Sequence, residues 1–226
     1  APAATSDGTD VAELARDEDD VLALGTRNQR LSRFWLTDQA GATPDPRLAG
    51  RSVVVLDGED DFVNMLRHLL GVMGMTSRVV RHEDYEPGCF ADDDLVVVGP
   101  GPGDPRDGTD PKIARMRAAV VELLEAERPF LAVCLGHQTL CHQLGLPLEF
   151  KDIVFQGTQS AVVLDDGDAA GRTERVGFYN TFVGRVGEST ALPAGVSVDV
   201  DADTGDVHAL RGPHYRGIQF HAESIL

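Results

Sequence analysis

Cys134 is the side chain whose surroundings most favour covalent chemistry in this sequence. The apolar run 130–133 predicts a short buried strand, and helix-compatible residues follow the cysteine through Leu144. A cysteine at a sharp turn between strand and helix, with Gly136 two residues later, is typical of a nucleophile elbow. The positive end of the helix would favour the thiolate, which is the nucleophilic form. A small, buried, hydrophobic cysteine explains this stretch equally well.

A histidine and a carboxylate near the end of the sequence favour the catalytic interpretation. His221 and Glu223 are two residues apart, so their side chains share one side of an extended backbone, whereas in a helix they would diverge by about 200°. In thiol acyl transfer the histidine accepts the thiol proton, the carboxylate orients the imidazole, and backbone N–H groups hold the oxyanion. Cys134, His221 and Glu223 form that constellation.

A metal-binding interpretation starts from the same helix. Cys134, His137, Cys141 and His142 could each ligate a metal, but their spacing matches no common zinc pattern, and an elbow would turn Cys134 away from Cys141. We expect no metal in this chain. A non-catalytic Cys/His module that binds a metal or a partner remains the alternative from another class. The simplest interpretation of the remaining histidines makes His137 and His142 structural and places His68, His82, His208 and His214 on the surface.

Three motifs together resemble the class I glutamine amidotransferases. They are Gly-Pro-Gly-Pro-Gly at 99–103, Cys-Leu-Gly-His-Gln at 134–138 and Gln-Phe-His-Ala-Glu-Ser at 219–224. More narrowly, residues 51–226 resemble the glutaminase domain of anthranilate-synthase-like enzymes. Within these enzymes, the segments 155–159 and 177–182, together with Ala222, look like the branch of phenazine-pathway 2-amino-2-deoxyisochorismate synthases.

The resemblance implies a role for each residue of the site. It makes Cys134 the nucleophile, His221 the base and acid, and Glu223 the orienting carboxylate. It implies an oxyanion hole built from a backbone N–H of the Gly101–Gly103 loop and from that of Leu135. Pro100 and Pro102 have no N–H, so this loop is unsuited to cradle a phosphate. The implied glutamine-binding residues are Gly101, Pro102, Gly103, Gln138, Thr181 and Phe182.

The implied activity is hydrolysis of L-glutamine, with ammonia passed to a chorismate-converting domain on the same polypeptide. We expect no cofactor in this chain, Mg²⁺ in the synthase half, and a homodimer of the full-length enzyme. The expected product is 2-amino-2-deoxyisochorismate, in phenazine-type secondary metabolism. The alternative is that the chain is the glutaminase of an anthranilate synthase in tryptophan biosynthesis.

Composition limits the partners and the compartment. The net charge of −17 comes mostly from aspartate, and no cluster of lysine and arginine interrupts it, so we expect neither nucleic acid nor a membrane as a partner. Three cysteines without a signal-peptide pattern predict a reduced, cytoplasmic protein. A hydrophobic content of 42% in 226 residues supports a sizeable core.

The pattern of elements predicts two parts. Residues 1–50 contain an amphipathic helical pattern over 21–35 and a linker at 41–46. The resemblance makes them the end of a preceding chorismate-converting domain, and a capping helix of the same domain is the alternative. From residue 51, alternating strands and helices predict an open, mostly parallel, doubly wound α/β sheet of the flavodoxin-like kind. After Gly145 the pattern changes to short β segments, at 160–164, 174–179, 196–200, 207–210 and 215–220. These segments predict a smaller antiparallel subsheet that delivers His221 to the elbow. The chain also looks cut at both ends, because it lacks an initiator Met and stops just after Glu223, where family members usually continue into a further helix.

Overall fold

The computed structural model describes residues 43–165, 171–187 and 190–224, and the unit considered below begins at Pro44. The helix predicted over residues 21–35 lies outside the described part of the chain. Among the described residues, no helix is both long enough and apolar enough to span a membrane.

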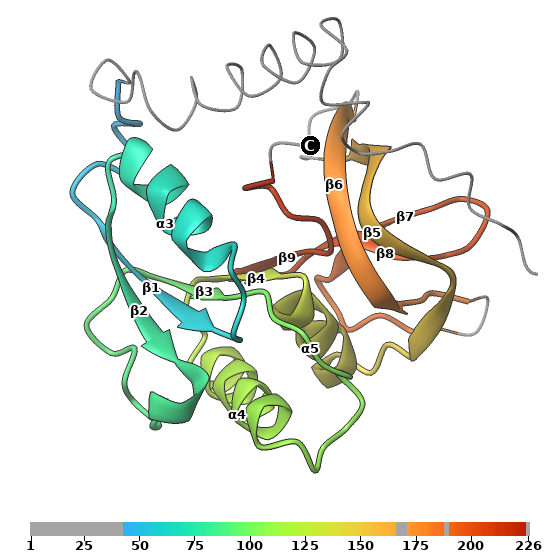
Figure 1. The fold of residues 1–226 in the computed structure, drawn as a ribbon, viewed down its shortest axis with the longest axis horizontal. Helices are drawn as coiled ribbons and strands as arrows, with labels where there is room; N and C mark the ends of the chain where they lie inside the picture. The colour runs from blue at the N-terminus through green and yellow to red at the C-terminus, as the bar shows by residue number, and fades with distance from the viewer. Residues whose placement is uncertain (1–42, 166–170, 188–189, 225–226) are drawn as a thin grey trace, which may run out of the picture. The chain divides into compact units, whose positions relative to one another are not determined.

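Five neighbouring strands of the main sheet are parallel to one another and run inward from one edge (Figure 1). Their order from one edge is β2, β1, β3, β4 and β9. Strands that are covered on both faces read as continuous apolar runs, which is why the sequence reveals the inner ones. Parallel pairing brings the carboxyl ends of all five strands to one edge, where doubly wound sheets place their sites. The bounds are Ser52–Asp57 for β1, Thr76–Arg81 for β2, Leu95–Val98 for β3, Phe130–Val133 for β4 and Tyr215–Ile218 for β9.

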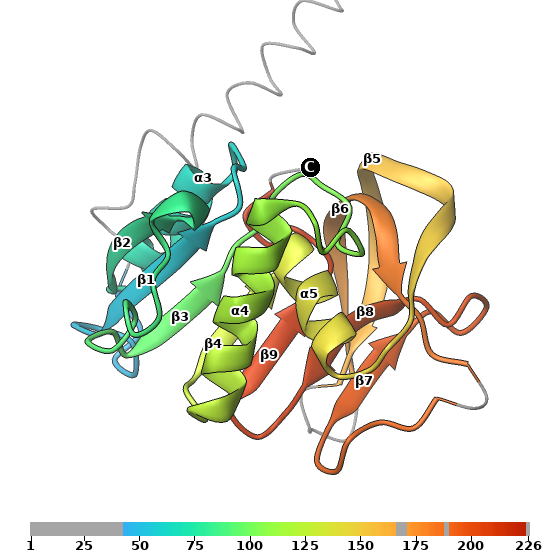
Figure 2. The same ribbon diagram turned by 90° about the horizontal axis from the view of Figure 1, so that it is seen from below.

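Helices cover both faces of this sheet. The helix α3 (Val63–Val72) packs on one face, and α4 (Pro111–Glu125) and α5 (Leu135–Gln143) lie side by side on the other (Figure 2). Successive strand side chains alternate between the faces, so Val53 belongs to the core under α3 and Val54 to the core under α4. The doubly wound fold predicted from the sequence is confirmed.

The start of α4 follows its sequence signal. Asp110 is the N-cap, and its side chain accepts the backbone N–H of Lys112 at 2.8 Å. Pro111 occupies the first helical position, where a missing N–H costs nothing. The apolar stripe that includes Ile113 and Met116 is fully buried.

The last third of the chain departs from the prediction in one respect. Only β5 (Leu148–Leu164) and β6 (Arg172–Gly184) form the separate antiparallel sheet, as a long two-stranded ribbon. The segments predicted to join it instead extend the main sheet: β9 pairs parallel with β4, and β8 (Val207–Arg211) and β7 (Ser197–Val200) follow antiparallel. Without β9, the buried strand β4 would leave one row of backbone groups unpaired.

Candidate active site

The turn after β4 holds Cys134 in a strained conformation. Its backbone φ is +49° with ψ −102°, and α5 begins at the next residue. A residue with a side chain costs of order 1–3 kcal/mol in such a region, and strain of this kind clusters at functional sites. Gly136 is required for a different reason. A Cβ at that position would lie 2.3 Å from the carbonyl oxygen of Val98, so only glycine lets α5 approach the end of β3 this closely.

His221 and Glu223 form a buried pair beside this turn. His221 Nδ1 and Glu223 Oε1 are 2.7 Å apart, and the two residues are 2% and 1% exposed. The backbone differs from the expected continuous strand, because β9 ends at Ile218 and Glu223 lies in a turn. His221 is instead fixed by a bridge to β6, where its N–H donates to the carbonyl oxygen of Gly177 at 2.9 Å.

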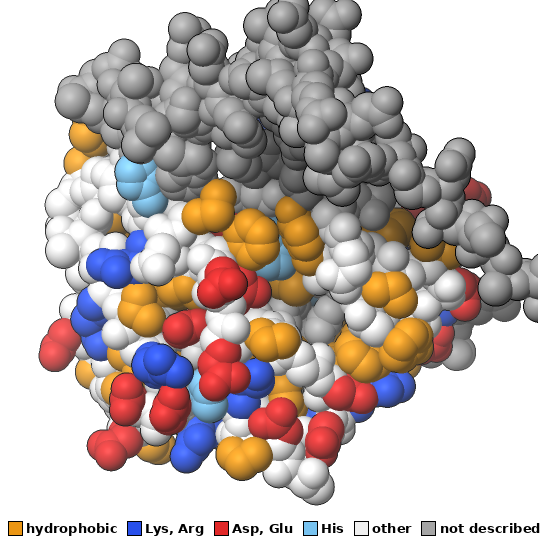
Figure 3. All heavy atoms as spheres, in the orientation of Figure 1, with side chains coloured by type: hydrophobic (Ala, Val, Ile, Leu, Met, Phe, Trp, Pro, Cys, Tyr) orange, Lys and Arg blue, Asp and Glu red, His pale blue; other side chains and the backbone are white. Residues whose placement is uncertain are grey.

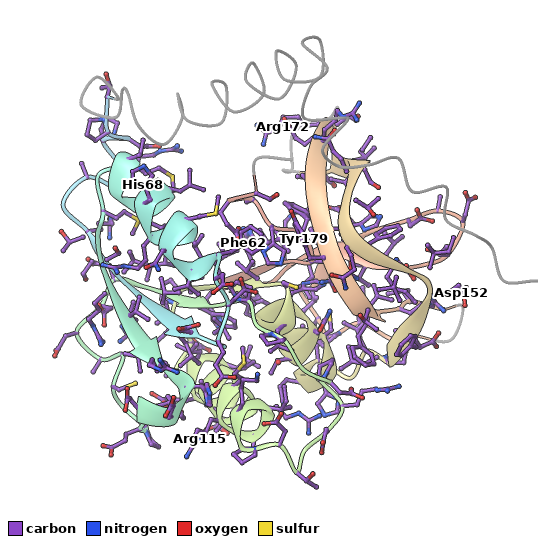
Figure 4. The ribbon with its side chains drawn as sticks, in the orientation of Figure 1. Phe62, His68, Arg115, Asp152, Arg172 and Tyr179 are labelled. Atoms are coloured by element: carbon purple, nitrogen blue, oxygen red, sulfur yellow. The ribbon has the colours of Figure 1, made fainter. Side chains whose placement is uncertain are left out.

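Two aromatic rings enclose the imidazole. The ring centroids of Phe62 and Tyr179 lie 5.1 and 5.2 Å from that of His221, and 5.2 Å from each other. Figure 4 labels the two residues close together, Phe62 at the start of α3 and Tyr179 on β6, and their rings are tilted by 48° to each other. The Tyr179 hydroxyl lies 3.2 Å from Ser224 Oγ, which ties the enclosure to the turn that carries Glu223. The rings therefore restrict both the imidazole and its access to water.

The protonation of His221 reflects these neighbours. Burial alone would lower the pKa of His221, but hydrogen bonds to Cys134 and Glu223 and their charges outweigh it and raise the pKa to about 10. Cys134 Sγ has two further polar neighbours, Gln219 Nε2 at 3.7 Å and the carbonyl oxygen of Tyr179 at 3.8 Å.

A pocket of about 350 Å³ opens over Cys134 and His221. In the space-filling view, a histidine is visible between hydrophobic side chains near the centre of the face (Figure 3). Six residues predicted to bind glutamine line the pocket: Gly101, Pro102, Gly103, Gln138, Thr181 and Phe182. Glu223 does not line it and reaches the pocket only through His221.

Of the two backbone segments predicted to form the oxyanion hole, one lines the same pocket as Cys134 and the other follows Cys134 directly in the chain. Gly101 and Gly103 line the pocket from the loop after β3. Leu135 is the first residue of α5, where a backbone N–H has no partner within the helix. Gly101 packs so tightly that a Cβ on it would lie 2.1 Å from the carbonyl oxygen of Gly58. The loop after β3 is thereby seated on the loop after β1.

Gln138 is held by the protein itself. Its Nε2 donates to the carbonyl oxygen of Phe182 at 2.7 Å and to Gln219 Oε1 at 3.1 Å. Gln138 is 4% exposed at the pocket wall, and its amide nitrogen is already engaged. The polar chain from Cys134 through Gln219 and Gln138 to β6 therefore connects the elbow with the wall at Phe182.

The structure also brings to the pocket five residues that the sequence does not single out as site residues: Asp60, Phe62, Gln156, Tyr179 and Asn180. Burial raises the pKa of Asp60, whose carboxylate accepts the N–H of Phe62 at 2.8 Å. Gln219 also contacts Cys134, and the sequence does not single it out, although its position two residues before His221 is a signal that could identify it. The aromatic residues gave no such signal, because an aromatic residue beside a helix start is ordinary core composition.

The Cys/His run on α5 does not gather into a metal site. His137 Nε2 lies 3.3 Å from the carbonyl oxygen of Val207 and 3.5 Å from Cys141 Sγ, while Cys134 faces the pocket. Within the described ranges, the group that brings three such ligands together is Glu59, His82 and Glu83. His82 was predicted to lie on the surface, and this was wrong: it is 8% exposed, behind the end of β2.

A cysteine on a strained elbow and a buried His–carboxylate pair, both at the carboxyl edge of a doubly wound parallel sheet, have the residue types that thiol acyl transfer uses. Residues 54–226 match the family described as glutamine amidotransferase class-I, and the chain belongs to this family. The resemblance inferred from the motifs is confirmed.

Within this family, the chain is similar to several individual proteins. The chain is 42% identical over 208 residues to the protein "Anthranilate synthase, phenazine specific" of Pseudomonas chlororaphis, which covers 90% of this chain and 32% of that protein. It is 32% identical over 194 residues to "Anthranilate synthase component 2, pyocyanine specific" of Pseudomonas aeruginosa, which covers 77% and 86%. A crystal structure of a glutamine amidotransferase from Thermotoga maritima shares the fold, with a TM-score of 0.63 at 17% identity and coverage of 77% and 76%. The chain thus spans about a third of the length of the phenazine-specific relatives.

Proposed function

We propose that this chain hydrolyses the side-chain amide of glutamine, with Cys134 as nucleophile, His221 as base and acid, and Glu223 as the carboxylate that orients His221. The observation that carries the proposal is that Cys134 and His221 line one pocket while Glu223 contacts His221 from behind at 2.7 Å. The Cys134 sulfur adds to the amide carbon, and His221 gives its proton to the departing ammonia. Water, deprotonated by His221, then cleaves the thioester to release glutamate and restore the thiol.

The oxyanion formed in each step needs hydrogen-bond donors at the position that the carbonyl oxygen of the substrate takes in the transition state. We propose the N–H of Leu135 and a backbone N–H of the Gly101–Gly103 loop for this role. Removal of one such donor typically costs about 3 kcal/mol of transition-state stabilisation. The same loop, with Gln138, Thr181 and Phe182, would hold the glutamine, and the location of all of these residues on the pocket wall supports this.

We further propose that the ammonia serves a chorismate-converting domain. The support is the similarity to phenazine-specific anthranilate synthases, of which this chain matches only about a third. A full-length enzyme given chorismate, glutamine and Mg²⁺ is then expected to form 2-amino-2-deoxyisochorismate without releasing pyruvate. Stoichiometric pyruvate and anthranilate in that assay would assign the chain to tryptophan biosynthesis instead, and leave the roles at Cys134 unchanged.

The direct test of the glutaminase step is Cys134→Ala. We expect it to abolish glutamine hydrolysis, while a full-length parent carrying it still uses free ammonia, because only the glutaminase step needs the thiol. Cys89→Ala is the matched control, since Cys89 lies outside the pocket lining and should leave turnover unchanged. Normal glutamine hydrolysis by Cys134→Ala would show that Cys134 is structural and would remove the proposal.

A further inference from the structure

Lys112 is a buried lysine close to the predicted oxyanion loop. Its side chain is 10% exposed, and Nζ donates to Glu59 Oε2 at 3.0 Å. Lysine is almost never buried unless it is paired, so this cation requires its carboxylate. The backbone of Lys112 is fixed as well, because its N–H is bonded to the N-cap Asp110 at 2.8 Å.

Glu59 is presented to Lys112 by an unusual turn. Its φ is +70°, and its N–H donates to Asp57 Oδ1 at 2.8 Å at the end of β1. The other carboxylate oxygen lies 3.2 Å from Nε2 of the buried His82. The hydrogen bond from Lys112 first, and then the nearby His82, lower the pKa of Glu59 to about 2. The carboxylate therefore stays charged and joins the ends of β1 and β2 to the start of α4.

The predicted oxyanion loop packs against Lys112 on one side and against Gly58, the neighbour of Glu59 in the chain, on the other. Gly58, which precedes Glu59, contacts Gly101: a Cβ on Gly58 would lie 3.3 Å from Gly101 Cα. On the other side, a Cβ on Gly103 would lie 3.7 Å from Lys112 Cε, so the lysine stem runs directly behind Gly103, whose φ is +136°. The Lys112–Glu59 ion pair thus links the residue that contacts Gly103, Lys112, to the neighbour of the residue that contacts Gly101, Gly58.

A metal does not account for this cluster. Glu59, His82 and Glu83 could offer three ligand atoms within 4.8 Å of one another. The Glu59 carboxylate, however, already bonds the Lys112 ammonium, whose positive charge would repel a cation there. The Lys112 ammonium therefore serves as the counter-ion of the Glu59 carboxylate, and this arrangement fits an internal ion pair better than a metal site.

We propose that Lys112, held by Glu59, is a positioning residue that keeps the Gly101–Gly103 loop in the geometry that stabilises the oxyanion. The inference rests on the proposed glutaminase function. It predicts a selective defect. Adding Cys134 to glutamine develops an oxyanion, whereas alkylation of the same thiol by iodoacetamide develops none. A displaced loop should therefore slow the first reaction and spare the second.

The experiment compares Lys112→Met, Lys112→Arg and Glu59→Gln with the unsubstituted chain. We expect Lys112→Met to lower kcat for glutamine about 10- to 100-fold, in line with the effect of a misplacement of about 1 Å. The rate of Cys134 alkylation should stay within about twofold. Lys112→Arg should recover part of kcat, because it restores the cation. Glu59→Gln alters a residue whose side chain is 46% exposed, so it perturbs the core less and should lower kcat in the same selective way.

Lys151→Met is the matched control, because Lys151 is also 10% exposed and also pairs with a carboxylate, that of Asp206. It should lower stability while keeping kcat within about twofold. Equal losses of kcat and alkylation rate in Lys112→Met and Glu59→Gln would mean general disruption and would overturn the inference, as would unchanged kcat in both. These outcomes are distinct from failure of the glutaminase proposal, which Cys134→Ala decides.

Discussion

Replacement of Glu223 by glutamine tests how the charge on His221 is set. The substitution keeps the shape of the side chain and leaves an amide oxygen that can still accept a hydrogen bond from Nδ1, 2.7 Å away in the parent. What it removes is the negative charge from a residue that is 1% exposed. The imidazolium of His221 then has one charged partner fewer in a site that water barely reaches.

The expected shift in the pKa of His221 follows from the opposing influences of burial and of its two hydrogen-bond partners. Its pKa is about 10, against an ordinary value of 6.5, because Cys134 and Glu223 outweigh the effect of burial. An opposite charge at hydrogen-bond distance shifts a pKa by about 1–3 units, so the loss of Glu223 should lower the pKa of His221 by about 2 units. That corresponds to about 3 kcal/mol less stabilisation of the imidazolium.

The sign of the pH dependence follows from the direction of the shift. The folded-state pKa of His221 lies above its unfolded value, so its contribution to the free energy of unfolding is complete below pH 6.5 and is lost as the pH rises through about 10. In Glu223→Gln the contribution of His221 to the free energy of unfolding should be lost at a pH roughly 2 units lower.

The assay is the rate of iodoacetamide alkylation of Cys134 against pH, in a Cys89→Ala background. The upper inflection of the profile reports loss of the His221 proton, and we expect it to move down by about 2 units in Glu223→Gln. The kcat for glutamine should fall about 10- to 100-fold, less than the ~10⁴-fold typical when an amide imposes the wrong tautomer, because packing still orients the ring. Asp61→Asn, at an exposed carboxylate near the pocket, is the control. Superimposable profiles for Glu223→Gln and its parent would refute the reasoning.

Three further predictions concern the elbow, a buried ion pair and the activity of the isolated chain. Gly136→Ala should distort the elbow and slow both alkylation and turnover at least 10-fold, since the new Cβ would meet the Val98 carbonyl oxygen at 2.3 Å. Gly71→Ala, in α3 with open space around it, should instead raise the free energy of unfolding by up to about 1 kcal/mol in denaturant unfolding. Normal activity of Gly136→Ala together with destabilisation by Gly71→Ala would contradict the packing argument. Asp206→Asn should cost about 3 kcal/mol by the same measurement, because Lys151 and Arg185 lose the charge of a carboxylate that is only 4% exposed; an unchanged denaturation midpoint would show that the pair contributes no stability. The isolated chain should hydrolyse glutamine slowly, since a glutaminase that feeds a partner must be activated by differential affinity for its active state, and rapid partner-independent turnover would refute this.

Much of the fold could be predicted because its signals are local. The run Phe130–Val133 is fully apolar and ends at a cysteine, and β4 has those bounds in the structure. Thr109-Asp110-Pro111 carries the cap and the helix start within three residues. The position of β9 had no local signal. Its segment reads as another short β run, and the choice between the ribbon and the edge of β4 depends on which buried strand lacks a neighbour.

The residues of the site also fall into those that the sequence predicts and those that it does not. Cys134, His221 and Glu223 could be proposed from residue type and spacing, and the structure brings them together even though the expected strand stops at Ile218. Phe62 and Tyr179 could not be proposed, because they meet His221 only after α3 and β6 pack against the end of β9. Contacts between distant elements leave no periodicity in the sequence.

The ribbon β5–β6 links substrate contacts to the base. Its strand β6 places Thr181 and Phe182 on the pocket wall, and a few residues earlier Gly177 accepts the backbone N–H of His221. Between these points Tyr179 packs edge-on against the imidazole. A shift of β6 relative to the main sheet would therefore move the proposed glutamine contacts and the proposed base together. Binding energy gained by glutamine along the ribbon can in this way help to orient His221 toward Cys134, because one strand carries both sets of contacts.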